Sequence, residues 1–156
     1  MIDHESESAE GQHSAFERVL VPIGKFQNTE RLITRVIQLY RQRPIEIHLL
    51  NVQSPFPRHV AMFFSAQEVR RFHIEDATEE LLPARALLVR AEVPFECHIE
   101  VGDYASSVAE CARKQHCSHI ILQDHGKGSV SRLVLGSLSN RVRQLVAGSN
   151  VLCELI

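Results

Sequence analysis

The sequence alternates short apolar segments rich in Val, Ile and Leu with longer segments whose apolar residues recur every three or four positions. The short segments suit buried strands, and the longer ones suit helices that pack one face. We expect the strands at residues 18–23, 45–52, 95–101, 119–123 and 150–156. Strict alternation of strand and helix favours a parallel sheet with helices on both faces, so the chain is predicted to be a doubly wound α/β domain.

The intervening segments carry specific helix signals. Asn28-Thr29-Glu30 can cap the first helix, Ser65-Ala-Gln-Glu68 forms a capping box, and Asp103 can cap the third helix. Pro83 lies inside the second helix and is expected to kink or divide it. The proline-containing segment 53–64 is expected to be a loop.

Composition sets broad limits on location and partners. Residues 1–16 are polar, acidic and without periodicity, which is typical of a disordered tail and leaves residues 17–156 as the α/β domain. The net charge of −2 indicates neither nucleic acid nor an anionic membrane as partner. The chain shows no bilayer-spanning stretch, no signal core and no C-x-x-C pair among its four cysteines. A cytoplasmic protein with reduced cysteines is therefore predicted.

Neither a metal site nor a catalytic constellation is predicted. Cys111, His116, Cys117 and His119 are close in sequence, but the passage from helix to strand would spread them too far apart for zinc. The pair Glu79-Glu80 is interpreted as solvated on the exposed side of a helix. No residue set combines a nucleophile, a base and an orienting group.

Glycines cluster after the fourth expected strand. Gly126, Gly128 and Gly136 fall within eleven residues, although the chain has only seven glycines. Glycine lets backbone N–H groups approach a ligand, and Gly136-Ser137 is expected at a helix start, where free N–H groups favour an anion. A plain turn would explain the same spacing, and the segment is neither a Walker loop nor a dinucleotide fingerprint. Lys127 suits either a phosphate contact or a solvated surface position.

The glycine pattern resembles that of the universal stress protein family, whose ATP-binding members carry G-x-x-G, nine residues and then G-[ST]. Gly126 followed by nine residues and Gly136-Ser137 matches the end of that motif. Three further landmarks of the family occur in order: Val19-Leu-Val-Pro22, Leu49-Leu-Asn-Val52 and Val101-Gly102-Asp103. The resemblance covers about residues 18–156 and implies a Rossmann-like sheet of the adenine-nucleotide alpha-hydrolase type, with strand order 3-2-1-4-5.

This resemblance also implies a function. It suggests a cytoplasmic stress-response regulator that binds ATP, with Mg²⁺ as the companion of the phosphates, and that hydrolyses ATP slowly at most. Val52 is expected to offer backbone contacts to adenine. The implied nucleotide-binding residues are Pro22, Ile23, Gly24, Val52, Gln123, His125, Gly126, Lys127, Gly136, Ser137 and Leu138.

Two departures from the family pattern leave an alternative open. Gln123 takes the place of the first motif glycine, and Gly24 stands where family members commonly place an acidic residue. The alternative is an interaction module that has lost nucleotide binding. An ATP-dependent ligase or pyrophosphatase is disfavoured, because Pro22-Ile-Gly-Lys25 lacks the S-G-G-x-D-S type of loop. Val151–Ile156 is expected to pair with a second copy in a homodimer, as in family members.

Overall fold

The computed structural model describes residues 16–25, 27–123 and 131–156, with only the helical backbone described for residues 131–137. The predicted acidic tail, residues 1–16, lies outside the described residues except for Phe16.

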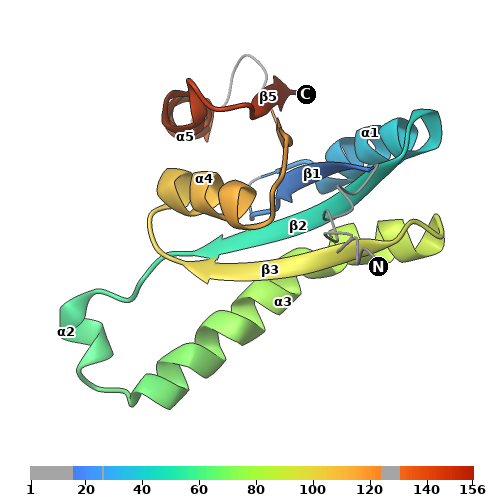
Figure 1. Ribbon diagram of the computed structural model, residues 1–156. Coiled ribbons are helices and arrows are strands. Elements are labelled where there is room, and N and C mark those ends of the chain that lie inside the picture. The colour runs from blue at the N-terminus through green and yellow to red at the C-terminus, as the bar shows by residue number, and fades with distance from the viewer. Residues whose placement is uncertain (1–15, 26, 124–130) are drawn as a thin grey trace, which may run out of the picture.

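The described strands form one parallel sheet in the order β3-β2-β1-β4-β5 (Figure 1). The predicted fold class and strand order are confirmed. In the register of the sheet, Leu20 of the central strand lies between His48 and Ile120. The strands are β1 (Glu17–Pro22), β2 (Ile45–Gln53), β3 (Phe95–Val101), β4 (His119–Leu122) and β5 (Leu152–Leu155).

Helices cover both faces of this sheet (Figure 1). The helices are α1 (Thr29–Gln42), α2 (Arg58–Ala61), α3 (Ala66–Arg90), α4 (Tyr104–Lys114) and α5 (Ser131–Val146). α1 and α3 pack on one face, while α4 and α5 pack on the other. The short helix α2 lies in the segment that was expected to be a loop. Within the described residues, none of the helices is both long and apolar enough to cross a bilayer.

The predicted helix caps are all formed. Asn28 accepts a hydrogen bond from the Arg31 N–H, and Asp103 accepts one from the Ser106 N–H. Ser65 and Glu68 form the full capping box, in which each side chain accepts from the other residue's backbone N–H. Local sequence therefore determines where α1, α3 and α4 begin.

Pro83 was expected to kink or divide the second predicted helix, and it does not divide it. α3 runs unbroken from Ala66 to Arg90. Proline removes one internal hydrogen bond and crowds the preceding turn. Leu81, two residues before it, and Ala84, directly after it, are 2% and 0% exposed in the same core, so packing on both sides of Pro83 stabilises the continuous helix.

Two apolar layers sandwich the central strand. Val19 and Val21 of β1 face the layer beneath α1 and α3, while Leu20 faces the layer beneath α4 and α5. All three side chains are 0% exposed. β1 must therefore be apolar on both faces, in agreement with its continuous run of aliphatic residues.

Adjacent leucines of α3 test this packing. Leu81 is 2% exposed, whereas Leu82 is 59% exposed, because successive residues lie about 100° apart around the helix. Leu81→Ala should lower the free energy of unfolding by about 2–5 kcal/mol, and Leu82→Ala by less than about 1 kcal/mol. Urea unfolding followed by circular dichroism measures both. Equal losses for the two variants would contradict the assigned face of α3.

Candidate functional site

A cavity of approximately 360 Å³ lies at the carboxyl ends of β1 and β2. Ile23 and Gly24 line it directly after β1, Val52 lines it from β2, and Leu138 lines it from α5. These four residues are among those the sequence predicted for a nucleotide site. The cavity shares β1 with the point where the strand order reverses, between β1 and β4, and open α/β sheets commonly bind ligands near that point.

The backbone N–H and carbonyl of Val52 face the β1 side of β2, beyond the point where β1 ends. The Ile23 N–H donates to the Leu50 carbonyl (2.8 Å), so the polar backbone groups of Leu50 face β1. Groups two residues apart on a strand face the same neighbour, so the N–H and carbonyl of Val52 also point toward the β1 side. Pairing with β1 stops at Pro22, opposite Leu50. A donor and an acceptor therefore stand side by side where the neighbouring strand has already ended.

Buried polar side chains support the end of β2. Asn51 is 0% exposed; its Nδ2 donates to the Ile23 carbonyl (2.9 Å) and to Glu80 Oε2 (2.7 Å). Gln53 Nε2 donates to Asn51 Oδ1 (2.8 Å). The Asn51 amide thus donates to the carbonyl that would otherwise continue the ladder to the Val52 N–H. The network therefore ties Ile23, directly after β1, to the end of β2 through the Asn51 side chain.

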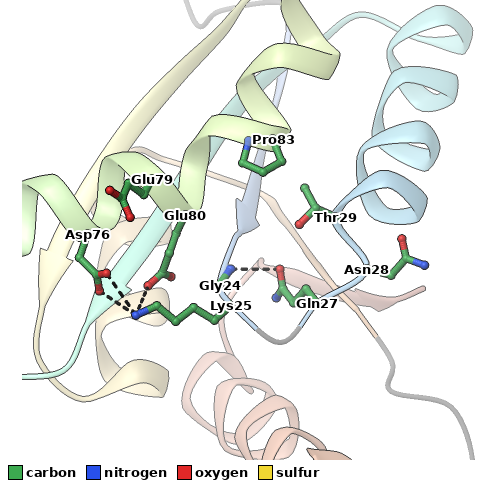
Figure 2. A pocket seen from close by; sticks show the side chains of 9 residues that line it. All are labelled: Gly24, Lys25, Gln27, Asn28, Thr29, Asp76, Glu79, Glu80 and Pro83. Carbon is green, nitrogen blue, oxygen red and sulfur yellow. Dashed lines mark hydrogen bonds and ion pairs between the residues drawn. The ribbon is translucent and has the colours of Figure 1, made fainter.

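Carboxylates from α3 reach the same place. Lys25 Nζ lies 3.0 Å from Asp76 Oδ2 and 3.4 Å from Glu80 Oε1 (Figure 2). The hydrogen bond to Asp76 raises the pKa of Lys25, which keeps the ammonium charged. A groove of approximately 700 Å³, lined in part by Asp76, Glu79 and Glu80, adjoins the cavity and shares Gly24 and Lys25 with it.

The interpretation of Glu80 as a solvated surface carboxylate is wrong. Its side chain is 11% exposed and accepts a hydrogen bond from Asn51. Sequence reasoning missed the network because the partners lie on separate elements. The available signal was two polar residues, Asn51 and Gln53, at the end of a strand that is otherwise largely apolar.

An aromatic side chain also lines the cavity. The ring of Phe56 lies 5.0 Å from that of His73, measured between centroids, and both residues line the cavity. His73 is 6% exposed. Phe56 also contacts Phe64 and Phe72 edge-on, so its orientation is held from several sides.

Gln123 is bonded to the start of α1. The Asn28 N–H donates to Gln123 Oε1 (2.6 Å), and Gln123 Nε2 donates to the Asn28 carbonyl (3.1 Å). The side chain is 5% exposed and does not line the cavity. Gln123 therefore joins the end of β4 to the cap of α1, and its amide is committed to backbone groups there.

The glycine loop is only partly described. His125, Gly126 and Lys127 lie outside the described residues. Gly136 and Ser137 were expected at a helix start, and that expectation is wrong: α5 begins at Ser131, so Gly136 is its sixth residue. Only about the first four N–H groups of a helix lack an internal partner, so the free donors belong to the first turn of α5. The remaining predicted residue, Pro22, ends β1.

A variant of Gln123 tests the joint between β4 and α1. Gln123→Ala would leave the N–H and carbonyl of Asn28 without these partners, at a cost of about 1–3 kcal/mol in the free energy of unfolding. Gln38→Ala, at an exposed position within α1, should change it by less than about 0.5 kcal/mol. Thermal and urea unfolding measure both. Identical stabilities for the two variants would show that the amide pair contributes nothing.

Several solved structures with this architecture are universal stress proteins. UspA from Lactobacillus plantarum matches with a TM-score of 0.69 and 13% identity, covering 90% of this chain and 97% of that one. A universal stress protein in complex with cAMP matches at 0.64 and 16% identity, covering 92% and 98%. The Archaeoglobus fulgidus protein in complex with dAMP matches at 0.63 and 15% identity, covering 90% and 98%. At these identities the likeness shows the fold.

Membership of a family follows from comparison of the sequence with known families. No curated protein matches it significantly. The model of the universal stress protein family, however, matches residues 15–149, which is most of the chain. The match includes β1 and extends through α5. The chain therefore belongs to the universal stress protein family.

Proposed function

We propose that this protein is a stress-response regulator that binds an adenine nucleotide in the cavity at the carboxyl ends of β1 and β2. The proposal depends on one observation: the N–H and carbonyl of Val52 face the β1 side of the sheet at a point where β1 has already ended. Structural neighbours solved in complex with cAMP and dAMP support the ligand class.

Adenine is complementary to such a backbone edge. Its N6 amine can donate to the Val52 carbonyl while its N1 accepts from the Val52 N–H. The cavity of approximately 360 Å³ is within the usual range for small-molecule sites. Phe56 and Leu138 supply apolar lining on which a flat base can rest.

The charges around the cavity orient the remainder of the nucleotide. Asp76 and Glu80 line it, and carboxylates suit ribose hydroxyl groups, which donate hydrogen bonds. These two carboxylates of α3 can take the place of the acidic residue that family members commonly carry at the position of Gly24. The same carboxylates repel phosphates, so the phosphates would extend away from α3.

The phosphates would extend toward the glycine loop. On family grounds, His125, Gly126, Lys127, Gly136 and Ser137 are the proposed contacts, with Mg²⁺ as the counter-ion when the ligand is ATP. Free N–H groups in the first turn of α5 would add attraction for an anion. Free cysteines throughout the chain are consistent with the proposed cytoplasmic location.

The alternative function is an interaction module without a nucleotide. Gly24 provides no carboxylate, and Lys25 already pairs with the acidic groups of α3. In that case the polar network would serve only to stabilise the end of the sheet.

Base specificity distinguishes the two functions. AMP and ATP should bind, whereas GMP and IMP should bind about tenfold more weakly or worse, because their O6 acceptor would face the Val52 carbonyl. Leu138→Trp, which places a larger side chain at the cavity, should weaken AMP binding about tenfold. Leu145→Trp, at a 53% exposed position of the same helix, should leave it unchanged. Isothermal titration calorimetry measures each affinity.

If calorimetry detects no heat of binding with AMP, or with ATP plus Mg²⁺, at millimolar concentration, the nucleotide proposal is refuted and the interaction module is favoured. Equal affinity for AMP and GMP would refute the backbone contact of Val52 while leaving the cavity as a site.

We also propose that the protein forms a homodimer through Val151–Ile156. β5 lies at the edge of the sheet beside β4. The N–H groups of Leu152 and Ile156 bond to residues on the β4 side, so the N–H of Cys153 faces outward. An outward row of backbone donors and acceptors suits pairing with a second copy.

A proline on β5 tests this interface. Cys153→Pro removes an outward N–H without removing a bond to β4, and should weaken the dimer about tenfold in dissociation constant. Leu145→Glu, exposed on α5, serves as the control. Sedimentation velocity over a concentration series measures the equilibrium. A wild-type protein that stays monomeric at high concentration would rule the dimer out.

A further inference from the structure

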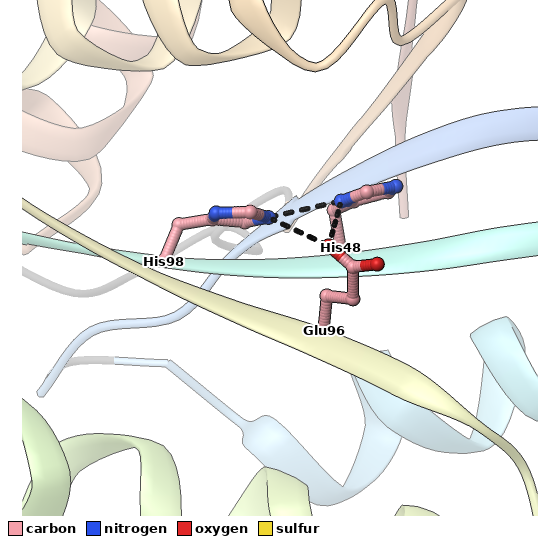
Figure 3. Close-up of side chains that lie close together, drawn as sticks. All are labelled: His48, Glu96 and His98. Carbon is pink, nitrogen blue, oxygen red and sulfur yellow. Dashed lines mark hydrogen bonds and ion pairs between the residues drawn. The ribbon is translucent and has the colours of Figure 1, made fainter.

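Two histidines and a glutamate meet on the face of the sheet that α4 and α5 cover (Figure 3). Glu96 and His98 are two residues apart on β3, so their side chains share one face of that strand. The register places His48 of β2 opposite Glu96. Neighbouring strands of one sheet thus present three side chains of metal-binding type to the same point.

Their ligand atoms are spaced for one ion. His48 Nδ1 lies 2.9 Å from His98 Nε2, and Glu96 Oε2 lies 3.7 Å from the first nitrogen and 3.9 Å from the second. Tetrahedral zinc, with ligands at about 2.0–2.1 Å, needs neighbouring ligand atoms roughly 3.3 Å apart. The three separations bracket that value, so small side-chain rotations would bring all three atoms into contact with one cation.

The three side chains differ in how deeply they are buried, and this difference suggests a separate role for the histidines and the carboxylate. His48 is 4% exposed and held within the sheet, whereas the Glu96 side chain is 70% exposed at the edge strand. The histidines form a fixed pair, the carboxylate can close over the ion, and water can complete the coordination from the solvent side. The nearby cation Arg18 is paired with Glu46 at 2.8 Å, which offsets its repulsion of a metal ion.

We propose that His48, Glu96 and His98 form a binding site for a divalent transition metal, with zinc as the expected ion. Two imidazoles and one carboxylate suit zinc and related first-row metals better than Mg²⁺ or Ca²⁺, which prefer oxygen ligands. None of the three residues lines the cavity at the carboxyl ends of the strands. The site is therefore separate from the proposed nucleotide site and independent of it.

The site was not expected from the sequence, which drew attention instead to Cys111, Cys117 and His119. In the structure His119 lies between Glu17 and Glu154, at 3.1 and 3.2 Å, and the two cysteines are buried in the core of the α4 side. His48 and His98 are fifty residues apart in the chain, so only the register of β2 and β3 brings them together.

Zinc titration of the full chain, freed of metal with a chelator, tests the proposal. Calorimetry with zinc chloride should show one equivalent bound, and Glu96→Gln and His98→Ala should each weaken binding about tenfold or more. Glu96→Gln changes an exposed side chain and so preserves the fold. Cys97→Ser, on the opposite face of β3, and His59→Ala, exposed on α2, should bind zinc as the wild type does.

Cobalt(II) provides a second measurement. Its absorption bands should indicate nitrogen and oxygen ligands, without the charge-transfer band of a thiolate. Wild-type zinc affinity in Glu96→Gln, loss of binding in Cys97→Ser, or a thiolate band with cobalt would each overturn the proposal. If His98→Ala does not fold, Glu96→Gln and the cobalt spectrum decide alone.

Discussion

The burial of β1 on both faces is the constraint on which the rest of the structure depends. Val19 and Val21 pack toward α1 and α3, and Leu20 packs toward α4 and α5, so both helical layers meet through this strand. The fully buried part of the strand, Val19–Val21, must be apolar, since a polar side chain there would lose water without gaining a partner. β1 is also where the strand order reverses, and the crevice at its carboxyl end follows from the same arrangement.

At the carboxyl end of β1, the apolar core gives way to hydrogen-bonded polar side chains. Asn51 donates to the Ile23 carbonyl and to Glu80, so the chain leaving β1 is tied to β2 through a side chain rather than through a ladder bond to Val52. The N–H and carbonyl of Val52 consequently remain oriented toward the crevice. Gln123 performs a related task on the other side by joining β4 to the cap of α1 at Asn28. The proposed site thus relies on buried polar side chains whose role is to position backbone groups.

The two proposed sites use different parts of one sheet. The nucleotide site would use strand ends, where backbone groups lack a neighbour. The metal site would use one face of the neighbouring strands β2 and β3, where their register brings His48 Nδ1 within 2.9 Å of His98 Nε2. The two sites also lie on different sides of the sheet, because the carboxylates of Asp76 and Glu80 come from α3, while His48 shares the opposite face of β2 with Leu50, which packs in the α4 and α5 layer. Each can therefore be tested without disturbing the other.

Much of the fold was determined by local sequence: strand positions by β-branched apolar runs, and helix starts by capping residues such as Asn28, Ser65 and Asp103. These signals act over a few residues, so sequence alone suffices to predict them. The continuity of α3 through Pro83, the burial of Glu80 and the pairing of His48 with His98 were decided by tertiary structure. Each depends on contacts between distant segments, whose energies exceed local preferences and leave no periodic trace in the sequence.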